Sequence, residues 1–279
     1  MKVLKTIEET KDTILRLREE GKSVGFVPTM GALHEGHLSL LSESISDNDV
    51  SVVSIFVNPI QFNNKEDLKK YPRTLEEDCE KLKDAGCDIV FAPSAEEMYP
   101  EEAEEKYDFG KLERVMEGAH RPGHFNGVAV VVKRLFDICT PHRAYFGEKD
   151  FQQLVIIRAL VEMENIPLEI IACPIIRESD GLAMSSRNVR LSSDERKVAP
   201  AIYNSLKNII EQKLINSASK CLRSEMEKLN AMPGMQVEYL LLADENTLEA
   251  VQDWDENRNL RVFIATFLGD IRLIDNLKV

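Results

Sequence analysis

The stretch FVPTMGALHEGHL, residues 26–38, constrains the fold of this chain more than any other part of its sequence. The apolar run at residues 24–27 overlaps its start and predicts a buried strand. Gly31 and Gly36 then loosen the backbone, and we expect a helix to begin at about His37. A strand, a tight turn and a helix in this order are typical of an α/β sheet.

Two histidines, His34 and His37, fall at the expected start of this helix. The open backbone N–H groups and the positive dipole end of a helix N-terminus attract phosphates, and imidazoles can donate hydrogen bonds to the same oxygens. A histidine at such a position is also often a simple cap or a solvated residue, so the motif alone leaves both interpretations open. Spacing excludes two other sites: zinc-protease histidines lie at i and i+4, not i and i+3, and no Gly-Lys-Ser/Thr follows a glycine run.

Apolar runs and helical patterns alternate along residues 1–175. The continuous, β-branched run at residues 50–57 is typical of a parallel strand that is covered on both faces. Shorter runs predict further strands at residues 87–92, 144–146 and 168–173. We therefore predict an α/β fold for residues 1–175, with a Rossmann-like, doubly wound and mostly parallel sheet.

Local signals predict helix starts and one long loop in this first domain. Thr6 with Glu9, and Thr74 with Glu77, have the spacing of capping boxes. The polar residues 58–71 follow a predicted strand and are expected to form a loop where such sheets bind ligands.

The pattern changes beyond residue 175. Ser192 with Glu195 starts a predicted helix, and further helical residues follow to about Asn230. Two apolar runs, at residues 237–242 and 262–268, close the chain. This grouping predicts a smaller α+β domain over residues 176–279.

Composition excludes several classes of function. The formal net charge of −13 over 279 residues would repel a long polyanion, so we expect no nucleic-acid partner. The five cysteines lack a Cys-x-x-Cys pair and are odd in number, which indicates reduced packing thiols in a cytoplasmic protein. The sequence shows no signal-peptide core and no run of bilayer length, so no membrane association is expected. The spacing of His120, Arg121 and His124 makes no metal site, and we predict none.

Polar residues at three further places are candidates for binding or catalysis. Lys149, in FGEKDFQQ at an expected strand-to-helix turn, can neutralise charge on a phosphate, and Asp150 can accept from ribose hydroxyls. Residues 184–188, MSSRN, offer two hydroxyls and a guanidinium on a loop expected to be mobile. Gln61 and Gln153 offer amides suited to a small polyhydroxy acid. Each of these is also compatible with an ordinary surface or linker residue.

Seven motifs occur in a fixed order that is similar to one known family. They are FVPTMGALHEGH, FVNPIQF, YPR, RPGHFNGV, YFGEKDFQQ, SDGLAMSSRN and the terminal RLIDN. Together they resemble the pantothenate synthetases, or pantoate–β-alanine ligases, over nearly the whole chain. That family belongs to the nucleotidyltransferases in which a His-x-Gly-His element and a mobile serine-rich loop bracket ATP.

The resemblance implies ATP-dependent condensation of (R)-pantoate with β-alanine to pantothenate, AMP and pyrophosphate, through an enzyme-bound pantoyl adenylate. It also implies Mg²⁺ with the ATP and a homodimer. It assigns pantoate to Gln61 and Gln153, β-alanine also to Gln61, the proton-donor role to His37, and further catalytic roles to His34 and Lys149. The implied ATP contacts are Met30, Gly31, Ala32, Leu33, His34, Glu35, Gly36, His37, Gly147, Glu148, Lys149, Asp150, Ile176, Met184, Ser185, Ser186 and Arg187.

The chain departs from the family pattern at a few positions. Asn63 and Asn64 replace a usual Gly-Pro, Ser179 precedes Asp180 where an alanine is common, and Ile175 and Ile176 stand where smaller residues are frequent. These changes bear on loop geometry and on the adenine contact, and they remove no catalytic group.

Two alternatives remain open. One is a different nucleotidyltransferase of the same fold, which the paired glutamines disfavour because they suit a hydroxy acid better than a phosphate acceptor. The other is a non-catalytic nucleotide-binding module.

Overall fold

The computed structural model describes residues 1–62, 65–101 and 103–279, and contacts within this part of the chain divide it into two compact units. Unit 1 is Met1–Glu148 with Gln153–Pro174, and unit 2 is Lys149–Gln152 with Ile175–Val279. The main division lies next to the expected boundary at residue 175. The short segment Lys149–Gln152, however, belongs to unit 2. We expect residues 1–175 to bind the nucleotide and pantoate and residues 176–279 to carry the mobile MSSRN loop, and these roles stay predictions.

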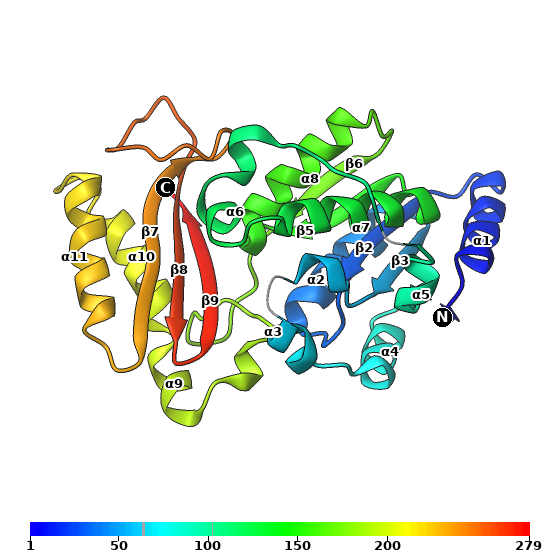
Figure 1. Ribbon diagram of the computed structural model, residues 1–279, viewed down its shortest axis with the longest axis horizontal. Helices are drawn as coiled ribbons and strands as arrows, with labels where there is room; N and C mark the ends of the chain where they lie inside the picture. Colours follow the sequence, from blue (N-terminus) through cyan, green and yellow to red (C-terminus); the bar gives the residue numbers. More distant parts are fainter. Residues whose placement is uncertain (63–64, 102) are drawn as a thin grey trace. The chain divides into compact units, whose positions relative to one another are not determined.

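Unit 1 is built on a six-stranded sheet in the order β1-β4-β3-β2-β5-β6, with every pair parallel (Figure 1). The strands are β1 (Lys2–Leu4), β2 (Val24–Thr29), β3 (Val50–Ile55), β4 (Ile89–Phe91), β5 (Arg143–Gly147) and β6 (Glu169–Cys173). In the central pair, Phe26 lies opposite Val52, and both are fully buried. The predicted doubly wound, parallel sheet is confirmed. The edge strand β1 was not predicted, because three residues are too few to show a period.

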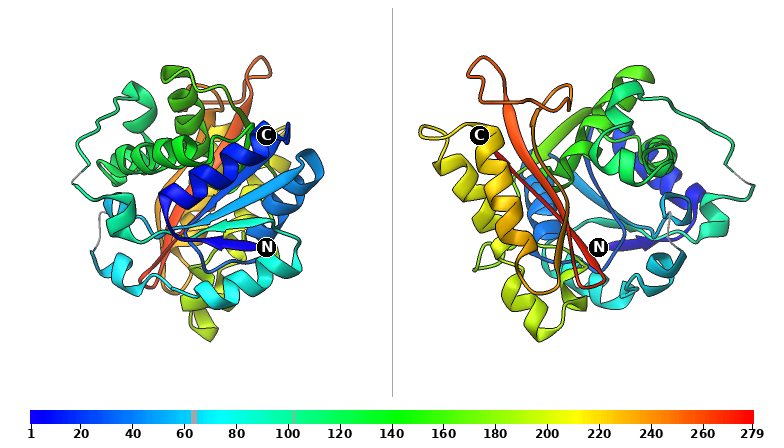
Figure 2. Two further views of the ribbon diagram at one scale, coloured as in Figure 1. Left: turned by 90° about the vertical axis from the view of Figure 1, so that its right-hand side faces the viewer. Right: turned by 60° about the vertical axis from the view of Figure 1, so that its left-hand side comes forward.

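Helices connect these strands in both directions along the sheet. They are α1 (Ile7–Glu19), α2 (Glu35–Asp47), α3 (Lys65–Lys70), α4 (Leu75–Asp84), α5 (Ala95–Met98), α6 (Met116–His120), α7 (His124–Cys139) and α8 (Phe151–Met163), with 3₁₀ turns η1 (Pro59–Gln61), η2 (Gly110–Glu113) and η3 (Glu148–Asp150). Right-handed crossovers in opposite directions place helices on opposite faces. On one face of the sheet, α1 and α7 pack against each other (Figure 2).

Two expectations about this unit are wrong. The segment at residues 58–71 is not one long loop, since it contains η1 and α3. The polar sequence HRPGHFNG, residues 120–127, is expected to form a loop, but the loop is shorter, because α7 already begins at His124 after Gly123 in the left-handed conformation (φ 80°).

The capping predictions have mixed outcomes. Thr6 accepts the N–H of Glu9 at the start of α1, at 3.3 Å, as predicted, but the capping box is not completed, because the Glu9 carboxylate accepts the Thr6 hydroxyl instead, at 3.1 Å. Thr74 does not cap α4, because its hydroxyl donates to the Asp78 carboxylate instead, at 3.1 Å.

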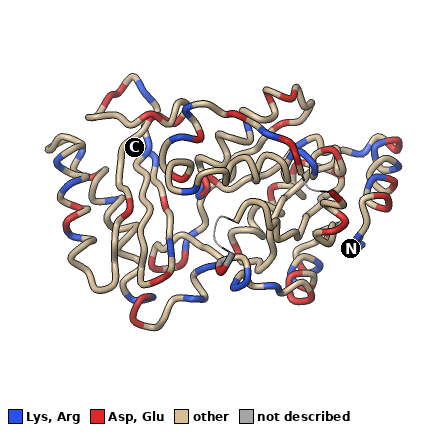
Figure 3. Tube along the Cα trace, viewed as in Figure 1, with Lys and Arg blue, Asp and Glu red and all other residues tan. Residues whose placement is uncertain are grey.

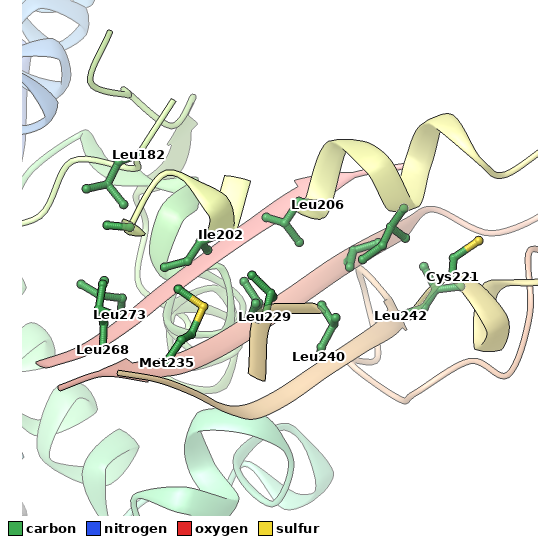
Figure 4. Close-up of a cluster of buried hydrophobic side chains, with 14 of the residues drawn as sticks. Leu182, Ile202, Leu206, Cys221, Leu229, Met235, Leu240, Leu242, Leu268 and Leu273 are labelled. Carbon is green, nitrogen blue, oxygen red and sulfur yellow. The ribbon is translucent and has the colours of Figure 1, made fainter. Parts of the chain in front are cut away.

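Unit 2 is a three-stranded antiparallel sheet, β7-β8-β9, with helices packed on it. Its elements are η4 (Asn188–Arg190), α9 (Ser193–Val198), α10 (Ala201–Glu211), α11 (Ala218–Asn230), β7 (Met235–Asp244), β8 (Leu260–Leu268) and β9 (Ile271–Lys278). The capping box of Ser192 and Glu195 is confirmed. Side chains such as Leu206, Leu229 and Leu242 form a core between the helices and the sheet (Figure 4). β9 was not predicted, because polar residues interrupt its apolar pattern.

Charged residues of both signs alternate along helices such as α1 (Figure 3). Among the described residues, no helix combines the length and the hydropathy needed to cross a bilayer.

Candidate functional site

The strand order of unit 1 reverses between β2 and β5. Beyond β2 lie β3, β4 and β1, and beyond β5 lies β6. At such a reversal the segments after the two strands diverge and leave a crevice at the carboxyl end of the sheet, where open α/β folds bind ligands. The candidate residues 30–37 follow β2, and Gly147 ends β5.

The turn after β2 is held by a buried carboxylate. Gly31 and Ala32 have left-handed backbones, with φ of 81° and 51°. Asp78 of α4 is 0% exposed and accepts the N–H groups of Ala32 and Leu33, each at 2.8 Å. Lys81 of the same helix donates to the Leu33 carbonyl at 2.8 Å. Glycine adopts this backbone readily, so the strain lies at Ala32; these bonds offset it and fix the chain just before the histidines.

Asp78 was missed by the sequence analysis. The signal that could have found it is its place four residues before the buried Leu82, on the inward side of α4. A carboxylate at such a position has to accept hydrogen bonds, because an unpaired buried charge is too costly.

His34 and His37 are joined at the start of α2. The helix begins at Glu35, two residues earlier than expected, because His34 is its N-cap. The Nδ1 atom of His34 accepts the Gly36 N–H at 3.1 Å, and that of His37 accepts the His34 N–H at 3.3 Å. The ring centroids lie 4.1 Å apart. Since both Nδ1 atoms accept, the neutral rings carry their protons on Nε2, the tautomer able to donate to a phosphate oxygen.

Gln61 is buried at the end of η1 and held by three neighbours. Its side-chain oxygen accepts from Asn58 at 3.1 Å, and its amide nitrogen contacts the sulfur of Met30 at 3.0 Å. The backbone oxygen of Gln61 lies 2.9 Å from Nδ1 of the buried His124, so that ring is protonated on Nδ1. His124 is therefore a structural partner of Gln61.

Gly127 lets α7 approach Gln61 closely. A Cβ atom at this position would lie 2.7 Å from the Ile60 carbonyl oxygen and 2.8 Å from the Gln61 Cα. Gln153, the other predicted pantoate residue, lies on the first turn of α8 and is partly buried. We expect Gln153 to lie across the crevice from Gln61, and this stays a prediction.

A cavity of about 380 Å³ opens at the carboxyl ends of β2, β3 and β4. Its wall is mainly apolar, with Ile55, Phe56 and Met30, and Arg73 and Glu96 supply charges. Met30 thus lines this cavity and also contacts the amide of Gln61. Neither histidine lines it.

Lys149 lies just before α8, at the start of the short segment Lys149–Gln152 of unit 2. Its backbone carbonyl accepts from the side chain of Asn276 at 2.9 Å, and its Nζ lies 3.9 Å from the Asp150 carboxylate. The Lys149 side chain is 20% exposed, so its stem is packed. From its place at a strand-to-helix turn we expect Lys149 to face the same crevice as His34 and His37, and this stays a prediction.

The serine-rich loop is tied at its base. Arg177 and Ala183 form an antiparallel bridge, and the Met184 N–H donates to the Ile176 carbonyl at 3.0 Å. Within the loop, the Ser185 hydroxyl accepts the Arg187 N–H at 3.3 Å. The predicted ATP residues Ile176 and Met184 are thus brought together, and the expected mobility of the loop stays a prediction.

Asp180, which follows the departure at Ser179, has a structural role. The carboxylate of Asp180 accepts from Arg196 at 2.5 Å and from the Leu182 N–H at 3.2 Å, and the bond from Arg196 lowers the Asp180 pKa. Gly181 beside it has φ 95°, and a Cβ there would meet the Tyr203 ring at 2.4 Å. The departures at Asn63 and Asn64 lie outside the described residues.

The cysteines and potential metal ligands form no further site in the described part of the chain. All five cysteines are free, and burial raises the pKa of Cys87 to about 12 and that of Cys173 to about 11. Such thiols are poor nucleophiles. No group of three His, Cys, Asp or Glu among the described residues could hold a metal ion.

Comparisons with known proteins find similarity over the full chain. The family model described as pantoate-beta-alanine ligase matches residues 2–278. A pantothenate synthetase of Bacteroides fragilis is 50% identical over 278 residues, covering 100% of this chain and 99% of that protein. The crystal structure of pantothenate synthetase from Thermus thermophilus has a TM-score of 0.93 at 45% identity and covers 100% of this chain and 99% of that one. A pantoate-beta-alanine ligase from Francisella tularensis, complexed with β-γ ATP and β-alanine, has a TM-score of 0.85 at 36% identity and covers 100% of this chain and 97% of that one.

Proposed function

This chain belongs to the pantoate–β-alanine ligase family and is therefore a ligase of pantothenate biosynthesis, and we propose that it activates (R)-pantoate with ATP as an enzyme-bound pantoyl adenylate. The observation that carries the proposal is the pair of histidine rings at the start of α2, directly after the strand beside which the sheet order reverses. Such a helix start with two ring donors suits a phosphate chain. The products are pantothenate, AMP and pyrophosphate.

The chemistry solves a plain difficulty, because a free carboxylate repels an incoming amine and has no good leaving group. In the first step, a pantoate carboxylate oxygen attacks the α-phosphorus of ATP, and pyrophosphate leaves with the electrons of the broken P–O bond. In the second step, the free amine of β-alanine attacks the acyl carbon, AMP leaves, and the nitrogen loses a proton. Holding the acid in line with the α-phosphorus can contribute roughly 7 kcal/mol.

The histidines and Lys149 stabilise the charge that develops on pyrophosphate. With Nδ1 of each ring accepting a backbone N–H, Nε2 is the donating atom, and His37 acts as the proton donor with His34 beside it. Lys149 adds a positive charge on the leaving group. These groups are preorganised by α2 and by the packed stem of the lysine, so little rearrangement accompanies the reaction.

ATP is proposed to contact four segments: residues 30–37, residues 147–150, Ile176 and residues 184–187. The Francisella tularensis relative, whose structure contains β-γ ATP and β-alanine, supports nucleotide binding in this family. Mg²⁺ is proposed to accompany ATP and to neutralise charge on its triphosphate. Asp150, Ser185 and Ser186 lie on the proposed ATP segments and carry oxygen atoms, the ligand type that Mg²⁺ prefers.

Pantoate is proposed to bind Gln61 and Gln153, and β-alanine to approach Gln61. The fixed amide of Gln61 and its contact with Met30 support a site for a small hydroxy acid with an apolar side. We extend the proposal to a cytoplasmic homodimer, in keeping with the five free thiols. Sedimentation velocity would test the dimer.

The family match decides against the two alternatives. A non-catalytic nucleotide-binding module is excluded, because the family and the named relatives are ligases. A nucleotidyltransferase with another acceptor is disfavoured for the same reason.

Oxygen labelling tests the proposed adenylate. The protein is supplied with ATP, Mg²⁺, β-alanine and pantoate whose carboxylate carries ¹⁸O, and the products are analysed by mass spectrometry. Attack on the α-phosphorus transfers one ¹⁸O atom to AMP. Label in inorganic phosphate, with ADP as the nucleotide product, would instead show an acyl phosphate and overturn the proposal.

A further inference from the structure

The terminal motif RLIDN contains two buried polar neighbours to which the proposed function gives no role. Asp275 and Asn276 lie side by side on β9 and are 3% and 1% exposed. Successive residues of a strand point to opposite faces of the sheet. The two side chains therefore leave β9 in opposite directions, and each must find hydrogen-bond partners on its own face.

The side chain of Asn276 reaches the segment that carries Lys149. Its Nδ2 donates to the Lys149 carbonyl at 2.9 Å, and its Oδ1 accepts from Arg261 at 2.5 Å. Arg261 is 3% exposed, donates to Glu245 at 2.8 Å, and has its guanidinium carbon 4.1 Å from the centre of the Phe151 ring. This chain of contacts therefore holds the segment at two points, the Lys149 carbonyl and the Phe151 ring.

Asp275, on the other face, reaches the base of the serine-rich loop. Its carboxylate accepts two hydrogen bonds from Arg177, at 2.6 and 3.0 Å. Arg177 also donates to the Gly181 carbonyl at 3.1 Å and pairs with Ala183 in the bridge just before Met184. A bidentate pair of this kind fixes both the position and the direction of the guanidinium.

We propose that Asp275 and Asn276 are positioning residues, which hold the two segments of unit 2 that contact ATP. Asn276 fixes the backbone at Lys149, and Asp275 fixes the base of residues 184–187 through Arg177. The two sets of contacts are coupled, since the Asp275 carboxylate accepts the Asn276 N–H at 2.8 Å. The inference rests on the proposed function, because it needs Lys149 and the serine-rich loop to act on ATP.

Hydrogen–deuterium exchange tests whether Asp275 and Asn276 hold the two segments, and it does not depend on enzyme activity. Asn276→Asp keeps the acceptor for Arg261 but replaces the donor to Lys149, while Asp275→Asn removes half of the bidentate pair. We expect faster amide exchange in peptides covering residues 149–152 for the first variant and residues 177–187 for the second. Arg272→Ala is the matched control, because Arg272 lies on the same strand and donates to Glu238 of β7. Unchanged exchange in both segments would overturn the inference.

Kinetics of pantoate-dependent pyrophosphate exchange test the catalytic part. We expect Asn276→Asp to lower kcat at least tenfold, since a misplacement of about 1 Å can cost up to a hundredfold, with the KM for pantoate within about twofold of the parent value. In a Lys149→Ala background, the same substitution should change kcat by less than about twofold, because both act through one group. If Asn276→Asp does not fold, Asn276→Ala replaces it in this test.

The outcomes separate this inference from the proposed function. If the parent protein exchanges pyrophosphate but Asn276→Asp keeps the parent kcat, or if the two substitutions are fully additive, the inference is wrong while the proposed function stands. If the parent itself shows no pantoate-dependent exchange, the proposed function fails, and the inference fails with it.

Discussion

Asp78 accepts the backbone N–H of Leu33 at 2.8 Å, although 45 positions separate the two residues in the chain. The same carboxylate accepts the Ala32 N–H and the Thr74 hydroxyl. One side chain of α4 therefore shapes the turn that delivers His34 and His37 to the end of β2. The geometry of the histidine pair depends on a residue that takes no part in the proposed reaction.

Asp78→Asn should destabilise the protein by about 1–3 kcal/mol, because an amide nitrogen cannot accept and leaves one buried N–H of the turn unpaired. Urea unfolding measures the change. Asp84→Asn, on an exposed position of the same helix, is the control and should shift stability by less than about 0.5 kcal/mol. Equal stability of the two variants would show that Asp78 does not hold the turn.

His37→Asn separates the capping role of this residue from its catalytic role. The asparagine oxygen replaces Nδ1 and can still accept the His34 N–H, but the variant has no Nε2–H. We expect stability within about 1 kcal/mol of the parent and a kcat for adenylation at least about a hundredfold lower. His37→Gln, whose amide nitrogen replaces Nε2, should recover part of the rate. An asparagine variant with the parent kcat would remove the proton-donor role.

Gly127→Ala should disturb Gln61, because the new Cβ would meet two backbone atoms of η1 at under 3 Å. The expected result is a loss of about 1–3 kcal/mol in stability and a KM for pantoate raised about tenfold. Gly147→Ala is the control for stability, since a Cβ at that position has open space. A normal KM in a folded Gly127→Ala protein would contradict the assignment of pantoate to Gln61.

His142 should make the protein less stable in mild acid. Its Nδ1 accepts the Val24 N–H at 2.9 Å at the start of β2, and burial, then Arg18 and Arg143, lower its pKa. Because the unfolded chain binds this proton more readily, folding stability falls as the pH drops below the ordinary histidine value of about 6.5.

The replacement His142→Asn keeps an acceptor but cannot titrate. We expect it to remove on the order of 0.5 kcal/mol of the stability loss between pH 7.5 and 5.5, a figure reduced by solvent screening of the partly exposed ring. Urea unfolding of both proteins at the two pH values measures this. An identical loss in the variant would assign the acid sensitivity to other groups.

Features encoded by neighbouring residues were predictable from the sequence. The capping box of Ser192 and Glu195 formed because both partners lie within one helical turn. The similar pair of Thr74 and Glu77 does not form a capping box, because the Thr74 hydroxyl donates to Asp78 instead. Asp78 also accepts the N–H of Leu33, a contact that neighbouring residues do not encode. Short strands such as β1 escaped prediction, because they are defined by their pairing with β4.

The same contrast holds for the candidate site. His34, His37 and Gln61 stand in motifs that can be recognised locally, and the family match supports the activity that these motifs implied. Asp78 and Asn276 were not identified as site residues, because their partners lie 45 and 127 positions away. The helical pattern of α4 indicates that Asp78 faces inward, but neighbouring residues do not encode the distant backbone group that it holds.

Pantoate-dependent exchange of labelled pyrophosphate into ATP, with Mg²⁺ present and β-alanine absent, tests the central claim most directly. Exchange requires reversible formation of an adenylate on the enzyme, so it isolates the first half of the reaction. We expect exchange only when pantoate is present, and conversion to AMP and pantothenate once β-alanine is added. A folded, ATP-binding protein that shows no exchange with pantoate would contradict the proposed adenylation.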